Sequence, residues 1–184
     1  MSHREGPQGP WRSDRIASAA SGLAMTDALE ILETVMDPEV PVLSIVELGI
    51  VRKVEVVPDS VIVTVTPTYS GCPAMHTIEA EIRKALLAAG FQAVELKTVY
   101  APAWTTDWIS APAREKLRAY GIAPPPPGAA SSELVPLQRA ARRIGCPYCG
   151  SADTEVVSDF GATACKSLHR CRDCRQPFEH FKPF

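Results

Sequence analysis

Residues 48–73 read LGIVRKVEVVPDSVIVTVTPTYSGCP, and most of the expected fold follows from this segment. Two runs rich in β-branched residues, 48–57 and 61–66, are separated by a Pro-Asp-Ser turn at 58–60. The second run alternates Val with Ile or Thr, which is typical of a strand with one buried face. We therefore predict a β-hairpin.

A helix is predicted directly after this hairpin. Apolar residues recur at helical spacing between Met75 and Ala89, and Gly90 ends the pattern. Pro73 suits the first position of a helix, which makes Cys72 its expected N-cap. A sulfur there lies beside free N–H groups and the positive end of the helix dipole, and both stabilise a thiolate. Cys72 is thus a candidate nucleophile or metal ligand, with a buried cap that has no chemistry as the alternative.

The neighbouring segments complete a mixed fold. Thr26 suits the N-cap of an earlier helix, whose apolar period stops at Pro38. Residues 94–100 predict a third strand, and 110–120 predict a short helix that Gly121 ends. The expected fold class is α+β, with a two-layer domain in the order helix, hairpin, helix, strand, followed by a small β domain.

Four regions are expected along the chain of 184 residues. Residues 1–24 hold few large apolar groups and are expected to form a disordered tail. Residues 25–122 are assigned to the first domain, 123–138 to a proline-rich linker, and 139–184 to a small metal ribbon. No run reaches about 18 apolar residues, and no signal-peptide core is present, so we expect a cytoplasmic protein without membrane spans.

The cysteines give the most specific signal in the sequence. Cys146 and Cys149 form one Cys-x-x-Cys knuckle, Cys171 and Cys174 form another, and 21 residues separate them. This spacing predicts four thiolates around one metal ion, and either zinc or iron accepts such ligands. Unligated cysteines or a thiol redox pair are the alternatives. Cys165 is either a packed small hydrophobic residue or an extra ligand.

A second candidate site surrounds Cys72. Asp37 and Glu39 lie in a loop bounded by prolines, where they are candidate oxygen ligands or a docking surface near Cys72, or else solvated carboxylates. His76 follows Cys72 by one helical turn, which raises a rival hypothesis of a thiol enzyme with His76 as its base.

A third hypothesis is a nucleic-acid-binding ribbon. Residues 139–184 carry eight basic and five acidic side chains, but the basic ones have little aromatic interleaving, so nucleic acid is a weak prediction. The histidines of this region, His169 and His180, are expected at the surface. The basic residues that motivate the hypothesis are Arg139, Arg142, Arg143, Arg170, Arg172 and Arg175.

Several short motifs resemble a known family. The segments DPEVP at 37–41, LGI at 48–50, TPT at 66–68 and GCP at 71–73 resemble the iron–sulfur assembly factors called metal–sulfur cluster biosynthesis proteins. With WTTDWI at 104–109, YGIAP at 120–124 and the terminal cysteines, the sequence resembles the PaaD family of bacterial phenylacetate degradation over about residues 26–184.

This resemblance implies a non-catalytic accessory protein of a multicomponent oxygenase, the phenylacetyl-CoA epoxidase. It implies an iron–sulfur assembly domain joined to a zinc-ribbon-like domain. The implied partners are oxygenase subunits or iron–sulfur assembly proteins, and a homodimer is compatible with it. The implied cofactors are zinc or iron in the ribbon and a transient iron–sulfur cluster. Asp37, Glu39 and Cys72 would bind or transfer the cluster, while the four knuckle cysteines would hold the ribbon metal.

Overall fold

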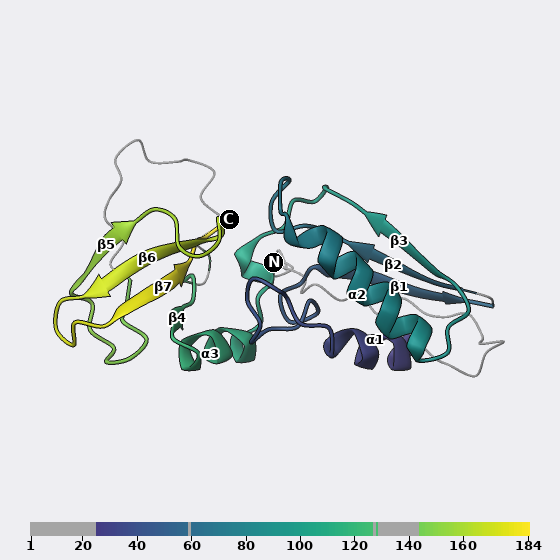
Figure 1. The fold of residues 1–184 in the computed structure, drawn as a ribbon, viewed down its shortest axis with the longest axis horizontal. Helices are drawn as coiled ribbons and strands as arrows, with labels where there is room; N and C mark the ends of the chain where they lie inside the picture. The colour runs from purple at the N-terminus through teal and green to yellow at the C-terminus, as the bar shows by residue number, and fades with distance from the viewer. Residues whose placement is uncertain (1–24, 59, 127, 129–143) are drawn as a thin grey trace, which may run out of the picture. The chain divides into compact units, whose positions relative to one another are not determined.

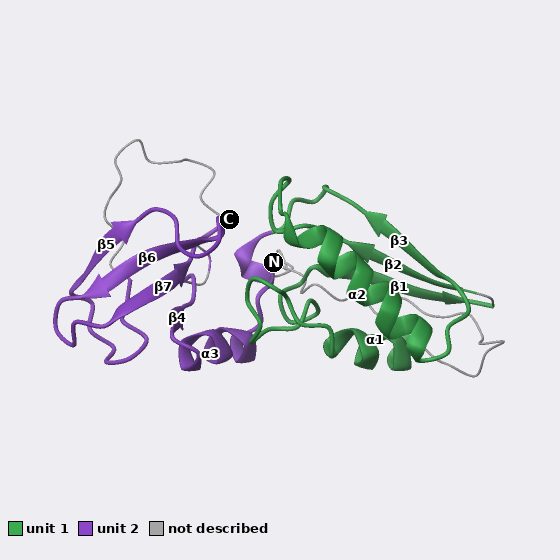
Figure 2. Cartoon of the chain, viewed as in Figure 1, with its two compact units in different colours: residues 1–104 green, residues 105–184 purple. Residues whose placement is uncertain are grey.

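The computed structural model describes residues 25–58, 60–126, 128 and 144–184 (Figure 1). The expected N-terminal tail and most of the expected linker lie outside these residues. The chain divides into two compact units, with the boundary between Trp104 and Thr105 (Figure 2). Each unit is therefore described by itself.

The first unit is a three-stranded sheet with helices. β1 (Val51–Val57) and β2 (Ser60–Val65) form the antiparallel hairpin, and β3 (Val94–Thr98) pairs in parallel with β2. The chain crosses from β2 to β3 through α2 (Ala74–Ala88), which lies over one face of the sheet (Figure 1), while α1 (Met25–Glu33) contacts both α2 and β1. The expected α+β class and element order are confirmed.

The core of this unit follows from the alternation in β2. Val61, Val63 and Val65 are fully buried, whereas Ile62 and Thr64 between them are only half-buried. Side chains three to four residues apart on α2 form the matching buried stripe, because that spacing places them on one helix face. The members of this stripe are Ala74, Ile78, Ile82 and Leu86.

The first strand begins later than expected, at Val51 instead of residue 48. Gly49 has a left-handed φ of 72°, and the N–H groups of Ile50 and Val51 both donate to the Ile45 carbonyl. These bonds hold the preceding residues in turns and not in the ladder. β3 likewise ends at Thr98 and not at residue 100.

The second unit is the ribbon. After the 3₁₀ turn η1 (Thr106–Trp108) and α3 (Ala111–Ala119) come β4 (Ile122–Ala123), β5 (Thr154–Ser158), β6 (Lys166–Cys171) and β7 (Pro177–Phe181). They form a sheet of order β4-β7-β6-β5, in which β4 runs parallel to β7 and the other pairs are antiparallel. The small β domain at the C-terminal side is therefore confirmed.

The boundary between the units lies earlier than the expected one at residue 122. β4 pairs with β7, and Thr106 donates its N–H to the carbonyl of Phe184 at 3.3 Å. Because these bonds tie the segment after Trp104 to the last strand, η1, α3 and β4 belong with the cysteine ribbon.

Candidate metal centre and cysteine site

The first knuckle is held by its own backbone. Cys146 donates its N–H to the Ser151 carbonyl at 2.8 Å, and Gly150 donates to the Cys146 carbonyl at 2.9 Å. Gly150 has a φ of 75°, a left-handed conformation that glycine adopts without steric cost. The turn brings the Cys149 sulfur back toward that of Cys146.

The second knuckle repeats two features of this geometry. Cys171 donates its N–H to the Gln176 carbonyl at 3.0 Å, again five residues later. Arg175 occupies the place of the glycine and has a φ of 63°, which is uncommon for a residue with a side chain. The two Cys-x-x-Cys segments therefore form a matched pair of loops.

The two loops bring their four sulfurs together. All four lie within 4.8 Å of one another, and two pairs, Cys146 with Cys174 and Cys149 with Cys171, are 3.6 Å apart. A disulfide would require about 2.05 Å. Four thiolates around a tetrahedral ion with metal–sulfur bonds of about 2.3 Å would lie about 3.8 Å apart. The donor set therefore fits one four-coordinate soft metal ion, and the ribbon is a metal-binding site.

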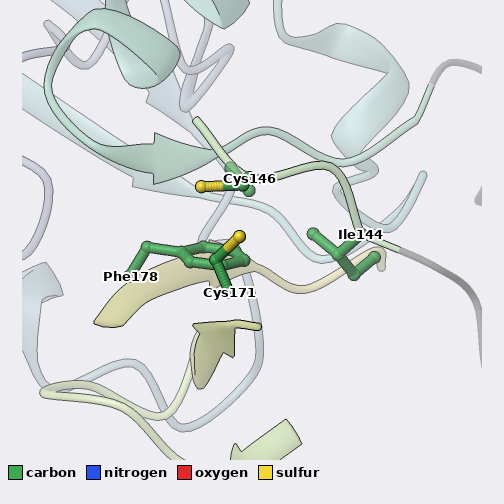
Figure 3. Close-up of a cluster of buried hydrophobic side chains, with 5 residues drawn as sticks. Ile144, Cys146, Cys171 and Phe178 are labelled. Carbon is green, nitrogen blue, oxygen red and sulfur yellow. The ribbon is translucent and has the colours of Figure 1, made fainter. Parts of the chain in front are cut away.

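The sulfurs differ in their surroundings. Cys146 and Cys171 are buried and form one hydrophobic cluster with Ile144 and Phe178 (Figure 3) and with Ala123. Cys174 is partly buried and packs against the same cluster. Cys149 is exposed. The metal centre is thus embedded on one side and open on the other.

The neighbouring thiols of the knuckles influence one another's ionisation. Backbone N–H groups of Cys174 and then Asp173 lower the pKa of Cys171 to about 7. At Cys174 the N–H of Gln176 favours the thiolate, but burial and the neighbouring thiols, that of Cys149 first, raise the pKa to about 12. A bound cation would remove this conflict, so metal binding must release protons.

Cys165 is not brought to this centre. It directly precedes β6, and Cys171 is the last residue of that strand, so about 20 Å of extended chain separates the two cysteines. Its buried sulfur lies 3.0 Å from the hydroxyl of Thr163, and its carbonyl accepts from Lys182 at 2.9 Å. Among the residues that the structure describes, the grouped metal ligands are the four knuckle cysteines.

Cys72 lies just before α2 and is half-buried. Its expected role as N-cap is wrong: Pro73, with helical φ and ψ of −69° and −22°, occupies that position, and the helix begins at Ala74. The sulfur nevertheless lies near the helix N-terminus, because the backbone N–H of Ala74 donates to it.

The expected stabilisation of the Cys72 thiolate is also contradicted. Burial is the largest influence and raises the pKa of this thiol above its ordinary value. The Ala74 N–H and the Thr68 side chain oppose that shift, while the negative charges of Glu39 and Asp37 add to it. The sequence pattern indicated the helix dipole and raised the loop carboxylates as neighbours of Cys72, but it could not decide that burial has the largest influence.

The loop carboxylates therefore lie within electrostatic reach of Cys72. The carboxylate of Asp37, which is only 5% exposed, accepts hydrogen bonds from the N–H groups of Glu39 at 2.8 Å and Val40 at 2.7 Å. Glu39 is half-buried. His76 is exposed and is not among the groups that shift the pKa of Cys72.

Ion pairs engage two of the arginines near the knuckles. Arg170 contacts one carboxylate oxygen of Glu155 at 2.5 Å, and Arg172 contacts the other at 3.1 Å. The pKa of Glu155 is lowered, chiefly by the hydrogen bonds from Arg170 and then Arg172. This pairing weakens the case for a nucleic-acid surface. Arg175 is exposed in the second knuckle, and the first three arginines of the predicted set lie outside the described residues.

The expectation that both ribbon histidines lie at the surface is wrong. His169 and His180 are each only 5% exposed, and their rings meet edge to face with centroids 5.5 Å apart. His169 also lies 2.9 Å from the Ser167 hydroxyl and stacks on Phe178. Strand alternation could have indicated this burial. His169 lies two residues from Cys171 on β6, and His180 lies two residues from Phe178 on β7, so each histidine shares a face with a buried residue.

Two protein families match separate parts of the chain. Residues 26–96 match the family described as iron-sulfur cluster assembly protein. Residues 130–182 match the PaaD zinc beta ribbon domain. The described residues contain no helix that is both long and apolar enough to cross a membrane.

The individual relatives differ in how much of this chain they match. An Escherichia coli K12 protein, named as the D component of a "Putative 1,2-phenylacetyl-CoA epoxidase", is 45% identical over 152 residues, which span 83% of this chain and 88% of that protein. An "Fe-S protein maturation auxiliary factor" of Porphyromonas gingivalis is 36% identical over 46% of this chain and 81% of its own length. A Bacillus anthracis crystal structure, titled as domain of unknown function DUF59, is 29% identical, covers 50% of this chain and 90% of its own, and has a TM-score of 0.48.

Proposed function

The chain belongs to the family of 1,2-phenylacetyl-CoA epoxidase D components, and from this membership we propose a non-catalytic accessory role in the cytoplasm: assembly or maturation of an iron or iron–sulfur centre in that epoxidase. The shorter relatives, named as Fe-S protein maturation auxiliary factors, match 46% and 43% of this chain, and the iron-sulfur cluster assembly family matches residues 26–96 of the first unit. Their names support assigning the maturation step to that unit. The partners would be the other epoxidase components or iron–sulfur assembly proteins, and pairing with a second copy is compatible with this role.

The observation that carries the proposal is that the charges of Glu39 and Asp37 act on the Cys72 thiol, whose sulfur lies near the N-terminus of α2. The half-buried Cys72 sulfur and the carboxylates of Asp37 and Glu39 would supply a mixed set of sulfur and oxygen ligands near the start of α2. Such a set suits transient contact with iron, whose ions accept both thiolate and carboxylate ligands. Binding of iron or a cluster there would favour loss of the thiol proton, because the cation offsets the influence of the carboxylates and of burial.

For the ribbon we propose resident zinc and a docking role. Four cysteines from two matched knuckles make a closed tetrahedral set, which is typical of structural zinc sites. Resident zinc would hold the loops together and so support a surface for the client protein. Acid-labile sulfide together with iron in protein purified without oxygen would instead assign a cluster to the ribbon.

Replacement of Cys72 tests the maturation step. In cells that lack the native protein, Cys72→Ala is expected to leave epoxidase activity at least about tenfold below wild type, as expected when a metal-site group is lost. The measurement is activity together with the iron and acid-labile sulfide content of the purified epoxidase components. His76→Ala, which alters an exposed residue on the same helix, is the matched control. Full activity with Cys72→Ala would refute the proposal.

Two substitutions of Asp37 separate its contribution to the stability of the first unit from the contribution of its charge to maturation. Asp37→Ala is expected to destabilise the first unit by about 2 kcal/mol, because it leaves the N–H groups of Glu39 and Val40 without their acceptor. Asp37→Asn keeps an acceptor oxygen, so it is expected to preserve stability while impairing maturation. Chemical denaturation and the epoxidase assay measure the two effects. Equal maturation by the Asp37→Asn and wild-type proteins would show that the charge has no role.

The rival thiol-enzyme hypothesis is less well supported. A nucleophilic cysteine needs a depressed pKa or an adjacent base. The pKa of Cys72 is raised, and its perturbing groups are Ala74, Glu39, Thr68 and Asp37 in addition to burial. We therefore favour a ligand role over nucleophilic catalysis.

A further inference from the structure

The four ribbon cysteines are not equivalent, although their loops are matched. Cys146, Cys171 and Cys174 all contact the hydrophobic cluster around Ile144 and Phe178. Within the described residues, Cys149 is the knuckle cysteine that stands outside this cluster, and it is exposed. Three sulfurs are thus held by packing as well as by their loops.

Backbone hydrogen bonds also distinguish Cys149 from Cys171. Cys171 ends β6, where it pairs with Thr154, and its sulfur accepts N–H bonds from Cys174 and Asp173. Cys149 lies in a turn, where its sulfur accepts one backbone N–H bond, from Ser151. Movement of Cys171 would disrupt the sheet, whereas movement of Cys149 would disrupt a single turn.

The space beside Cys149 is open. A Cβ atom placed on the adjacent Gly150 would meet nothing within 4 Å, and Tyr148 on the other side is 57% exposed. An incoming group can therefore approach the Cys149 sulfur from solvent. Cys146 and Cys171, by contrast, are only 3% and 0% exposed.

We propose that Cys149 is the exchangeable ligand of the ribbon metal, and that an incoming thiolate enters the site by replacing it. In this exchange one metal–sulfur bond forms from the incoming thiolate as the bond to Cys149 breaks. The Cys149 sulfur keeps its electron pair and takes a proton from water, so no oxidation or reduction occurs. This inference rests on the proposed presence of a resident metal in the ribbon.

Alkylation of the metal-loaded full chain tests the order of release. Limiting iodoacetamide is added without a chelator, so that the first alkylation occurs while the ribbon is still folded around its metal, and modified peptides are counted by mass spectrometry over time. Cys149 is expected to react first of the four knuckle cysteines, at least about tenfold faster than Cys146 or Cys171. Reaction of either buried cysteine before Cys149, or of all four at one rate, would overturn the inference.

Matched serine variants provide a second readout. Cys149→Ser is expected to keep a folded ribbon with one metal ion but to release it to a zinc chelator about 10- to 100-fold faster. Cys174→Ser, the equivalent change in the second knuckle, is expected to lower metal content more strongly because that sulfur packs on the cluster. The reverse ranking would contradict the proposal. Metal-free wild-type protein would overturn both this inference and the proposed ribbon metal, whereas a loaded protein alkylated in another order would overturn this inference alone.

Discussion

The Cys171→Ser protein is expected to bind no metal and to lose the fold of its ribbon, while the first unit stays folded. Cys171 is fully buried, ends the inner strand β6 and accepts two backbone N–H bonds at its sulfur. Serine supplies no thiolate there. Metal binding contributes about 10–16 kcal/mol to the folding of small zinc domains, far more than a ribbon of this size can replace by packing.

Metal analysis and amide hydrogen exchange would measure this result. Protection is expected to disappear from β5, β6 and β7 and to persist in β1, β2 and α2. Cys165→Ser is the matched control, because it changes another buried cysteine of the same unit that is not grouped with the metal ligands. A Cys171→Ser protein with one bound metal and a protected ribbon would refute the assignment of this ligand.

The second large effect is a loss of ribbon stability in acid caused by His180. Burial first, and then the charge of His169, lower the pKa of His180 from 6.5 to about 4. Below pH 6.5 the unfolded chain binds a proton that the folded ribbon does not, so the free energy of unfolding falls as the pH drops toward 4. The loss attributable to this histidine is about 3 kcal/mol.

Comparison with His180→Phe isolates this contribution. The unfolding free energy of the variant is expected to gain about 3 kcal/mol relative to wild type between about pH 7 and about pH 4. Both proteins release metal in acid, so the difference between their unfolding free energies does not contain that effect. His180→Gln removes the titrating ring but keeps a polar group, so it should show the same trend. A difference that does not change with pH would exclude His180 as the cause.

Strong local patterns made part of the structure predictable from the sequence. The alternation of Val61, Val63 and Val65 predicts β2 because it has the period of a strand, and the paired Cys-x-x-Cys spacing predicts the four-sulfur cluster. β4 has two residues and carries no detectable period. It joins the ribbon only through pairing with distant β7, so the boundary at residue 104 could not be predicted from local signals.

The chemistry of the individual sites was less predictable than their location. The pKa of Cys72 depends on burial and on carboxylates that a separate loop supplies, and neither can be inferred from the residues next to it. The burial of His169 and His180 similarly depends on how two strands pair. Local sequence thus located the reactive groups, whereas the tertiary structure determined their protonation.

The order of strands in the ribbon has a consequence for how the protein is made. β7 is the last of the four strands to leave the ribosome, yet it lies between β4 and β6. Both knuckles, which end at Cys174, are therefore synthesised before the strand that attaches β4 to the sheet. Completion of the sheet thus depends on pairing of the last strand with β4, from which more than 50 residues separate it, so closure of the sheet is the non-local step in folding of this unit.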